Sequence, residues 1–311
     1  MKMNLRKVLT SLVASTTIAV ASGSIIHSVT NHNKSVLYDV REEEKDNFSR
    51  VTENYLHEIE PKPEIERGLT KLVIPHEGNY VTFVYSGEGP DSYRNALRRI
   101  FEKNLRPATG EETASLFYSI FCDEKFINKS ESKKIRGLLR NSPTGNWLWV
   151  PNINLWTPEG VYVVYDEKGM GQDYKLDVEE LESSLKNAKE IGGVKFSENG
   201  KIRFAPKNTY IVGQHSYYGN DKNHGLYSYE RFAENGFIIA SYGLEGAKKL
   251  EEVTRKFQSD PCIWTIDVDR SEQKNSALFC GPYIDLRLFA CAAFNDNHTA
   301  YFVGVLPESE R

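Results

Sequence analysis

The sequence predicts an α+β protein with a mixed sheet, in which a β-α-β unit and antiparallel carboxy-terminal strands are flanked by helices. The main observation is the stretch Phe237–Asp269, where an apolar run (FIIASYG) precedes an amphipathic segment, a polar turn and a second apolar run (CIWTIDVD). This order is typical of two strands joined by a crossover helix. A second observation is the alternation of apolar segments and turns over residues 277–305, which predicts antiparallel strands.

The crossover helix is predicted from its periodicity. Its apolar residues recur at spacings of three and four, so they share one face of a helix. Gly243 supplies the turn between the first strand and the helix, and Pro261 stops the helix before the second strand at Cys262–Val268. The apolar face comprises Leu244, Ala247, Leu250, Val253 and Phe257.

The amino terminus predicts export. A basic start precedes the uncharged run Val8–Ala21, which ends in the small residues of a cleavage site. The alternative is an uncleaved anchor reaching Ile26, but Ser and Thr dilute this stretch below the roughly 20 apolar residues of a spanning helix. Residues 1–26 are therefore predicted to be a signal peptide or membrane anchor, residues 27–44 a flexible tether, and residues 45–311 a single globular domain.

The charge pattern excludes several partners. The chain has a formal net charge of −4, and cleavage of the leader would remove Lys2, Arg6 and Lys7 and make it more acidic. No long basic run is present, so binding to nucleic acid is not expected. Contact with a membrane is expected only through an uncleaved amino-terminal segment. The predicted location is extracytoplasmic, either secreted or anchored.

The four cysteines of the chain form no CxxC pair, so their spacing gives no zinc signature. In an exported protein, an even number of cysteines permits disulfides. Cys280 and Cys291 flank a predicted hairpin and are the candidate pair. The alternative is two buried thiols on neighbouring strands.

The other elements follow in chain order. Asp46 begins a predicted helix, and a predicted hairpin over residues 72–85 turns at His76–Asn79. The turn Gly87–Asp91 resembles a phosphate cradle, but Glu88 and Asp91 would repel a phosphate, which favours an ordinary turn. Further helices are predicted over residues 112–122, 132–139, 178–189 and 227–233, a strand over residues 160–165, and a hairpin over residues 192–205 that turns at Asn199-Gly200.

Three tryptophans, Trp147, Trp149 and Trp156, lie in a proline-broken segment. Such a segment can form a surface on which sugars or peptides stack, although tryptophan more often packs onto the core.

The second half of the chain resembles a group of uncharacterised archaeal proteins. The resemblance rests on the segments Thr157–Val163, Asp177–Asn187, Lys201–Pro206, Phe237–Val253 and Pro261–Leu278. These motifs are structural, and the group has no assigned activity. The resemblance therefore implies an order of elements and no catalytic residue.

The candidate site is the polar loop over residues 214–225, which holds His215, Asp221 and His224. These three side chains could bind a metal, a histidine could act as a general base, or the loop could hold a neutral ligand. An exposed turn without a ligand is the simpler interpretation. The pair His76-Glu77 and the carboxylates Asp267 and Asp269 are weaker candidates, which exposed turns and turn capping also explain.

Two functions are favoured, and nucleotide binding through the turn Gly87–Asp91 is a third possibility. The absence of a strong catalytic signature favours an exported, non-enzymatic binding or surface-associated module. The alternative is a hydrolase or metal-dependent enzyme that uses the loop over residues 214–225, so the sequence leaves enzymatic activity undecided. It predicts neither a cofactor nor a particular ligand.

Overall fold

The computed structural model describes residues 15–21, 24–31, 34–39, 65–66, 69–85, 90–140, 147–212, 228–280, 287–295 and 298–307. The chain divides into two compact units, Met1–Lys62 and Pro63–Arg311. The helix predicted from Asp46 lies outside the described residues.

The first unit contains an antiparallel sheet of three strands. Strand β1 (Ser15–Ala21) pairs with β2 (Ser24–Asn31), which pairs with β3 (Lys34–Asp39). These strands fall in the segments predicted as leader and tether, and both of those assignments stay predictions.

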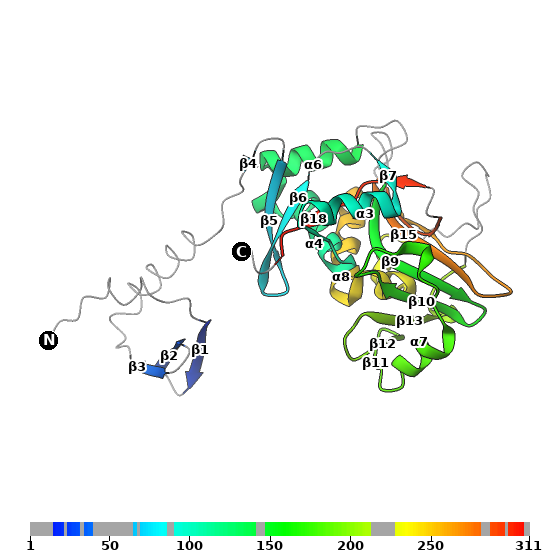
Figure 1. The fold of residues 1–311 in the computed structure, drawn as a ribbon. Coiled ribbons are helices and arrows are strands. Elements are labelled where there is room, and N and C mark those ends of the chain that lie inside the picture. The colour runs from blue at the N-terminus through cyan, green and yellow to red at the C-terminus, as the bar shows by residue number, and fades with distance from the viewer. Residues whose placement is uncertain are drawn as a thin grey trace. The chain divides into compact units, whose positions relative to one another are not determined.

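The second unit is built on an eight-stranded sheet (Figure 1). The strand order is β11-β12-β13-β10-β9-β15-β16-β14, and all neighbours are antiparallel except β14 and β16, which are parallel. The strands are β9 (Leu148–Thr157), β10 (Gly160–Tyr165), β11 (Lys189–Ile191), β12 (Val194–Phe196), β13 (Ile202–Pro206), β14 (Cys262–Trp264), β15 (Glu272–Cys280) and β16 (Leu288–Phe294).

A smaller sheet joins segments that are distant in the sequence. Its order is β4-β5-β6-β18-β8, and a separate two-stranded sheet pairs β7 with β17. The hairpin predicted over residues 72–85 is confirmed, and its turn residues Glu77 and Gly78 both have positive φ, as a tight hairpin turn requires. The strands are β4 (Ile65–Glu66), β5 (Leu69–His76), β6 (Asn79–Tyr85), β7 (Asp91–Ser92), β8 (Arg106–Pro107), β17 (Thr299–Ala300) and β18 (Gly304–Val305).

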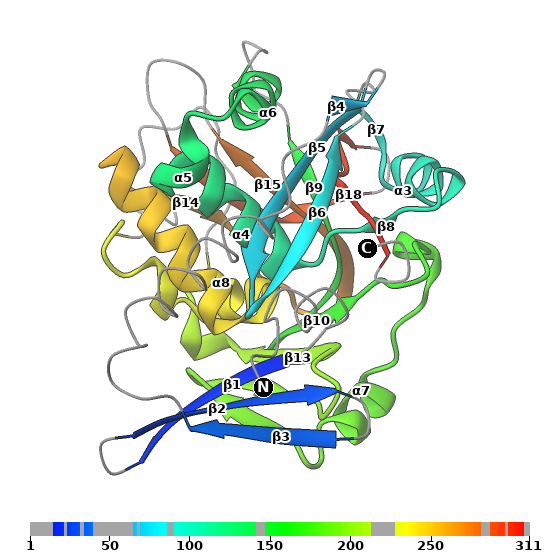
Figure 2. The same ribbon diagram turned by 90° about the vertical axis from the view of Figure 1, so that its left-hand side faces the viewer.

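Helices cover both faces of the large sheet. On one face, α4 and α8 pack against each other (Figure 2), and α6 contributes to the same hydrophobic core. On the other face, α3 packs against Trp149, and α7 packs against Tyr162. The helices are α3 (Tyr93–Glu102), α4 (Gly110–Phe121), α5 (Glu124–Ile127), α6 (Ser130–Arg140), α7 (Val178–Ser184) and α8 (Gly236–Phe257), with 3-10 turns η2 (Gly171–Asp173), η3 (Lys207–Thr209) and η4 (Phe232–Glu234).

Two predicted helices need correction. Helix α7 begins after Asp177, whose side chain accepts from the amide of Glu180, but it ends at Ser184, and Lys189 already belongs to β11. The helix predicted over residues 227–233 is only the short turn η4 in the described part of that segment.

The start of α4 is fixed by a capping box. The Thr109 hydroxyl accepts from the Glu112 amide, and the Glu112 carboxylate accepts from the Thr109 amide at 2.9 Å. The same carboxylate pairs with Arg106 at 2.6 Å and is buried. Burial alone would raise the pKa of Glu112, but the hydrogen bonds and charge of Arg106 outweigh it and lower the pKa.

The segment predicted as the first strand of the β-α-β unit is helical. Residues Phe237–Tyr242 form the opening turns of α8, which begins at the cap Asn235. At Gly243 the backbone has φ 68° and ψ 166°, so α8 is two helices joined by a kink. Glycine is required there because other residues avoid this conformation. The apolar face predicted for the following helix is confirmed, since Ala247, Leu250 and Val253 are buried.

The kink frees backbone carbonyls, and buried side chains satisfy them. Arg203 Nη1 donates to the Ala240 carbonyl at 3.0 Å, and Asn152 Nδ2 donates to the Ser241 carbonyl at 3.1 Å. Arg203 also pairs with Glu111 at the start of α4. The kink is therefore the point where the sheet, α4 and α8 are held together by polar contacts.

The predicted fold class is confirmed, and the crossover has a different first strand. From β13 to β16 along the sheet, each strand is antiparallel to the one before it, and β14 is parallel to β16, so β13 and β14 run in the same direction. Helix α8 lies between these two strands in the chain. The β-α-β connection therefore starts at Ile202–Pro206 rather than at Phe237. The strands at the carboxy-terminal end are antiparallel as predicted.

Two of the three indole rings in the tryptophan-rich segment pack into the core. Trp149 and Trp156 are buried on opposite faces of the sheet. Trp147 is half-buried and lies 5.5 Å from Trp264 and 4.8 Å from Phe294 between ring centroids.

Candidate functional site

The three residues predicted to form a site, His215, Asp221 and His224, lie outside the described residues. The segment that carries them leaves the described chain after Val212 and returns at Ser228. Within the described residues, no group of three or more His, Cys, Asp or Glu side chains is placed to hold a metal ion.

A pocket of about 580 Å³ lies where this segment leaves and returns. Its volume is within the range of about 300–1,000 Å³ that is typical of small-molecule sites. We call it the Tyr210 pocket. The described residues that line it are Gly192, Asn208, Thr209, Tyr210, Ile211, Ser228, Arg231 and Glu234.

Local backbone contacts hold the wall of the Tyr210 pocket in place. After β13, the turn η3 is closed by the Thr209 hydroxyl, which donates to the Pro206 carbonyl at 2.7 Å. The first residue of α8, Gly236, lies so close that an added Cβ would be 1.9 Å from that hydroxyl. On the other side, Thr265 donates to the Ile211 carbonyl at 2.9 Å. The wall is thus part of the folded scaffold.

Tyr210 gives the pocket a hydroxyl that has no hydrogen-bond partner among the described residues. The residue is 7% exposed, and its ring packs edge-on against Trp156 at 5.9 Å. Its hydroxyl makes no hydrogen bond to the described part of the chain. Burial, and secondarily the charge of Asp267, raises the pKa of Tyr210, so the hydroxyl stays a neutral donor at all physiological pH values. The hydroxyl is not among the fully buried polar atoms without a partner, so it is accessible, and a ligand or a water can accept its proton.

The mouth of the pocket combines opposite charges with an apolar side chain. Arg231 donates to Glu234 through Nε at 2.8 Å and through Nη2 at 2.6 Å. Ile211 is 48% exposed, which is unusual for isoleucine. No sequence motif marks these residues, because they lie in and beside the short turns η3 and η4.

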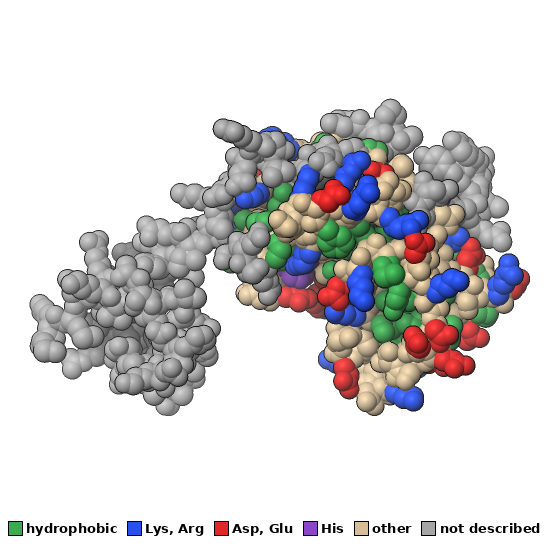
Figure 3. Space-filling model, viewed as in Figure 1, with side chains coloured by type: hydrophobic (Ala, Val, Ile, Leu, Met, Phe, Trp, Pro, Cys, Tyr) green, Lys and Arg blue, Asp and Glu red, His purple; other side chains and the backbone are tan. Residues whose placement is uncertain are grey.

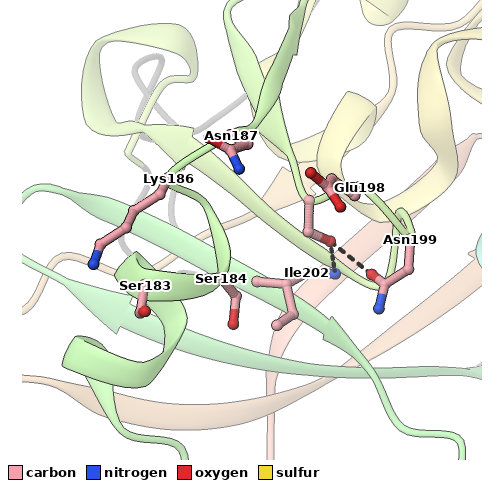
Figure 4. A pocket seen from close by; sticks show the side chains of 8 residues that line it. Ser183, Ser184, Lys186, Asn187, Glu198, Asn199 and Ile202 are labelled. Carbon is pink, nitrogen blue, oxygen red and sulfur yellow. Dashed lines mark hydrogen bonds between the residues drawn. The ribbon is translucent and has the colours of Figure 1, made fainter.

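A second pocket, of about 350 Å³, lies between the end of α7 and the β12–β13 turn (Figure 4). We call it the α7 pocket. The turn that forms one wall is closed by Ser197, whose hydroxyl donates to Asn199 Oδ1 at 2.8 Å and accepts from the Ile202 amide at 3.1 Å. The Ile202 side chain lies between Ser184 and Asn199 in Figure 4. Most of its lining residues are exposed, and it contains no buried polar group without a partner.

The pair His76-Glu77 leads to a cluster that the sequence did not predict. His76 is only 14% exposed, so it is not part of an exposed turn, and its Nδ1 lies 2.9 Å from the Ser115 hydroxyl on α4. Lys249 on α8 donates to the same hydroxyl at 2.8 Å, and Ser115 itself donates to the Glu111 carbonyl at 3.0 Å. Burial lowers the pKa of Lys249. Ser115 is 1% exposed, so this cluster joins three elements of the core rather than facing a substrate.

The remaining candidates are structural. Asp267 is exposed and pairs with Lys207 at 2.6 Å, a hydrogen bond that lowers the pKa of Asp267. Asp269 is exposed. Residues 86–89 of the glycine-rich turn lie outside the described residues, and Asp91 pairs with Arg99 at 2.7 Å and accepts from the Ser92 amide.

Cys280 and Cys291 do not form the predicted disulfide. In the β15–β16 register, Cys280 is opposite Leu288, and Cys291 is opposite Ala277. The two sulfurs therefore point to opposite faces of the sheet, one into each core cluster. The alternative prediction, two buried thiols on neighbouring strands, agrees with the structure.

Charged side chains of both signs alternate over the visible described surface (Figure 3). Along α3, for example, Arg94 pairs with Asp173, and Arg98 lies 3.6 Å from Glu102. In the described part of the chain, no helix combines the length and the apolar character needed to cross a bilayer.

The sequence matches no family model and no curated protein. Among solved structures, a match is a chain from work described as "Accommodation of massive sequence variation in Nanoarchaeota by the C-type lectin fold". It shares 18% sequence identity, covers 69% of this chain and 94% of that chain, and has a TM-score of 0.38. A TM-score of this size carries no argument about function. The resemblance to uncharacterised archaeal proteins stays a prediction.

Proposed function

We propose that this protein is a non-enzymatic binding module that holds a small ligand in the Tyr210 pocket. The observation that carries the proposal is the hydroxyl of Tyr210, a largely buried residue that lines a ligand-sized pocket and whose hydroxyl makes no hydrogen bond to the described residues. The described lining residues offer an ion pair, hydroxyls and an amide for polar contacts, and the side chains of Tyr210 and Ile211 for apolar ones.

We also propose that the module works outside the cytoplasm. The support is the amino-terminal sequence alone, with its basic start, uncharged run and small residues before the predicted cleavage site. Amino-terminal sequencing of the protein recovered from its native host tests this: a chain that starts at Met1 in the cytoplasm refutes it.

The binding proposal is tested by measuring the melting temperature of the full chain against a library of small metabolites, followed by calorimetric titration of each stabilising compound. A compound that binds this pocket should lose about tenfold or more in affinity in Tyr210→Phe, because the ligand loses one hydrogen bond. The matched control is Tyr162→Phe, a buried tyrosine beside α7 whose hydroxyl lies 3.5 Å from Glu182. Equal affinity of every ligand for Tyr210→Phe and the unmodified protein refutes the assignment of the pocket.

A further inference from the structure

We infer that the ligand of the Tyr210 pocket is a small zwitterion, a free α-amino acid or dipeptide with an apolar side chain. This inference rests on the proposed function, since it names the ligand class of the same pocket. It follows from three properties of the lining residues, which are the charge at the mouth, the donor in the wall and the apolar side chain beside it.

The first property is the paired charge of Arg231 and Glu234. Their side chains are 71% and 60% exposed, so the pair is solvated and the attraction between the two charges is weak. Both charged groups are therefore accessible to the groups of a ligand. A carboxylate can join Arg231 while an ammonium joins Glu234, and the net charge of the site does not change. A simple anion would face Glu234, and a simple cation would face Arg231, so each gains less than a molecule that carries both charges.

The second property is the donor in the wall. The pKa of Tyr210 is raised, so its hydroxyl donates and does not ionise. A carboxylate or peptide carbonyl oxygen is the acceptor that matches it, and a bond to a charged acceptor is the stronger kind. The nearby Asn208 amide and Thr209 hydroxyl offer further polar contacts.

The third property is the apolar contact at Ile211, which is 48% exposed and lines the pocket next to the ring of Tyr210. An apolar ligand side chain would cover this surface and gain roughly 25 cal/mol per Å² of buried apolar area. The volume of about 580 Å³ limits the occupant to a small molecule.

Calorimetric titration of the full chain with leucine, leucyl-leucine and the uncharged N-acetyl-leucine amide tests the ligand class. The expected result is that at least one zwitterion binds, that blocking both charges weakens binding at least tenfold, and that glycine binds more weakly than leucine. Glu234→Gln should weaken the zwitterion about tenfold, because the ammonium loses its partner. Glu245→Gln is the matched control, since Glu245 also forms an exposed ion pair three residues along a helix, with Lys248.

The two proposals fail differently. If N-acetyl-leucine amide binds as well as leucine and loses affinity in Tyr210→Phe, the zwitterion inference is refuted and the pocket is retained. If a zwitterion binds with the same affinity to the unmodified protein, Tyr210→Phe and Glu234→Gln, both proposals are refuted. If none of the three compounds binds at millimolar concentration, the zwitterion inference is refuted, and the library screen decides the pocket.

Discussion

Gly243→Ala should destabilise the fold through two separate costs, backbone strain and a close contact with Glu111. Gly243 has φ 68° and ψ 166°, a region that is nearly exclusive to glycine and costs other residues about 1–3 kcal/mol. An added Cβ would also lie 3.0 Å from Cγ and Oε1 of Glu111, whose carboxylate pairs with Arg203. Displacing that carboxylate in a packed environment adds about 1–3 kcal/mol. The free energy of unfolding should fall by about 2–6 kcal/mol.

Urea unfolding followed by far-ultraviolet circular dichroism measures this loss. The control is Gly200→Ala, which also has a positive φ (67°) but no atom within 4 Å of the added Cβ, and it should cost about 1–2 kcal/mol. In a Glu111→Ala background the clash disappears, so Gly243→Ala should then cost only the backbone strain. Equal losses in Gly243→Ala and Gly200→Ala would show that α8 is not kinked against α4 as described.

Four further predictions follow from other contacts. Ser115→Ala should lower the free energy of unfolding by about 1–3 kcal/mol, measured by urea titration, because His76 and Lys249 lose their shared acceptor. In the folded protein, the pKa of Glu112 lies below its ordinary value of 4.5. The Glu112 carboxylate therefore stabilises the fold above that pH, and this stabilisation is lost as the pH falls through the folded pKa. Glu112→Gln should flatten the pH dependence of the melting temperature below about pH 4.5. Burial raises the pKa of Cys122 to about 11, so iodoacetamide should modify it at pH 8 only after unfolding, as peptide mass mapping would show. Amino-terminal sequencing of the exported protein should begin after Ala21, and an intact leader on the exported protein would favour the anchor.

The sequence predicted helices and strands well where one face of the element is buried and the other is exposed to solvent. The face of Leu250 and Val253 was readable because charged residues separate its apolar members. The hairpin at Glu77-Gly78 was readable from its turn chemistry.

The sequence failed where a segment is buried on all sides. Phe237–Tyr242 is fully buried, so it lacks polar residues to mark a period, and its aromatic and β-branched residues resemble a strand. The start of the helix was signalled only by Asn235, and its kink only by Gly243, which also suits a strand-to-helix turn. The disulfide prediction failed for a related reason, since the strand register that separates Cys280 from Cys291 is not visible in their spacing.

The Tyr210 pocket could not be predicted because its lining residues come from the β11–β12 turn, η3 and the region of η4, which the fold brings together. The loop over residues 214–225 that was predicted to carry a site lies outside the described residues, and its site stays a prediction.

The position of β18 has a consequence for how this protein is made. Gly304 and Val305 lie between β6 and β8, so an inner strand of the smaller sheet is supplied by a segment far along the chain from its neighbours. A ribosome must therefore deliver the polypeptide through residue 305 before that sheet can close. Until then β6 and β8 lack their shared neighbour, and such long-range pairing makes folding slow and leaves strand edges exposed to aggregation. A chaperone that shields the nascent hairpin is expected to raise the yield of native protein.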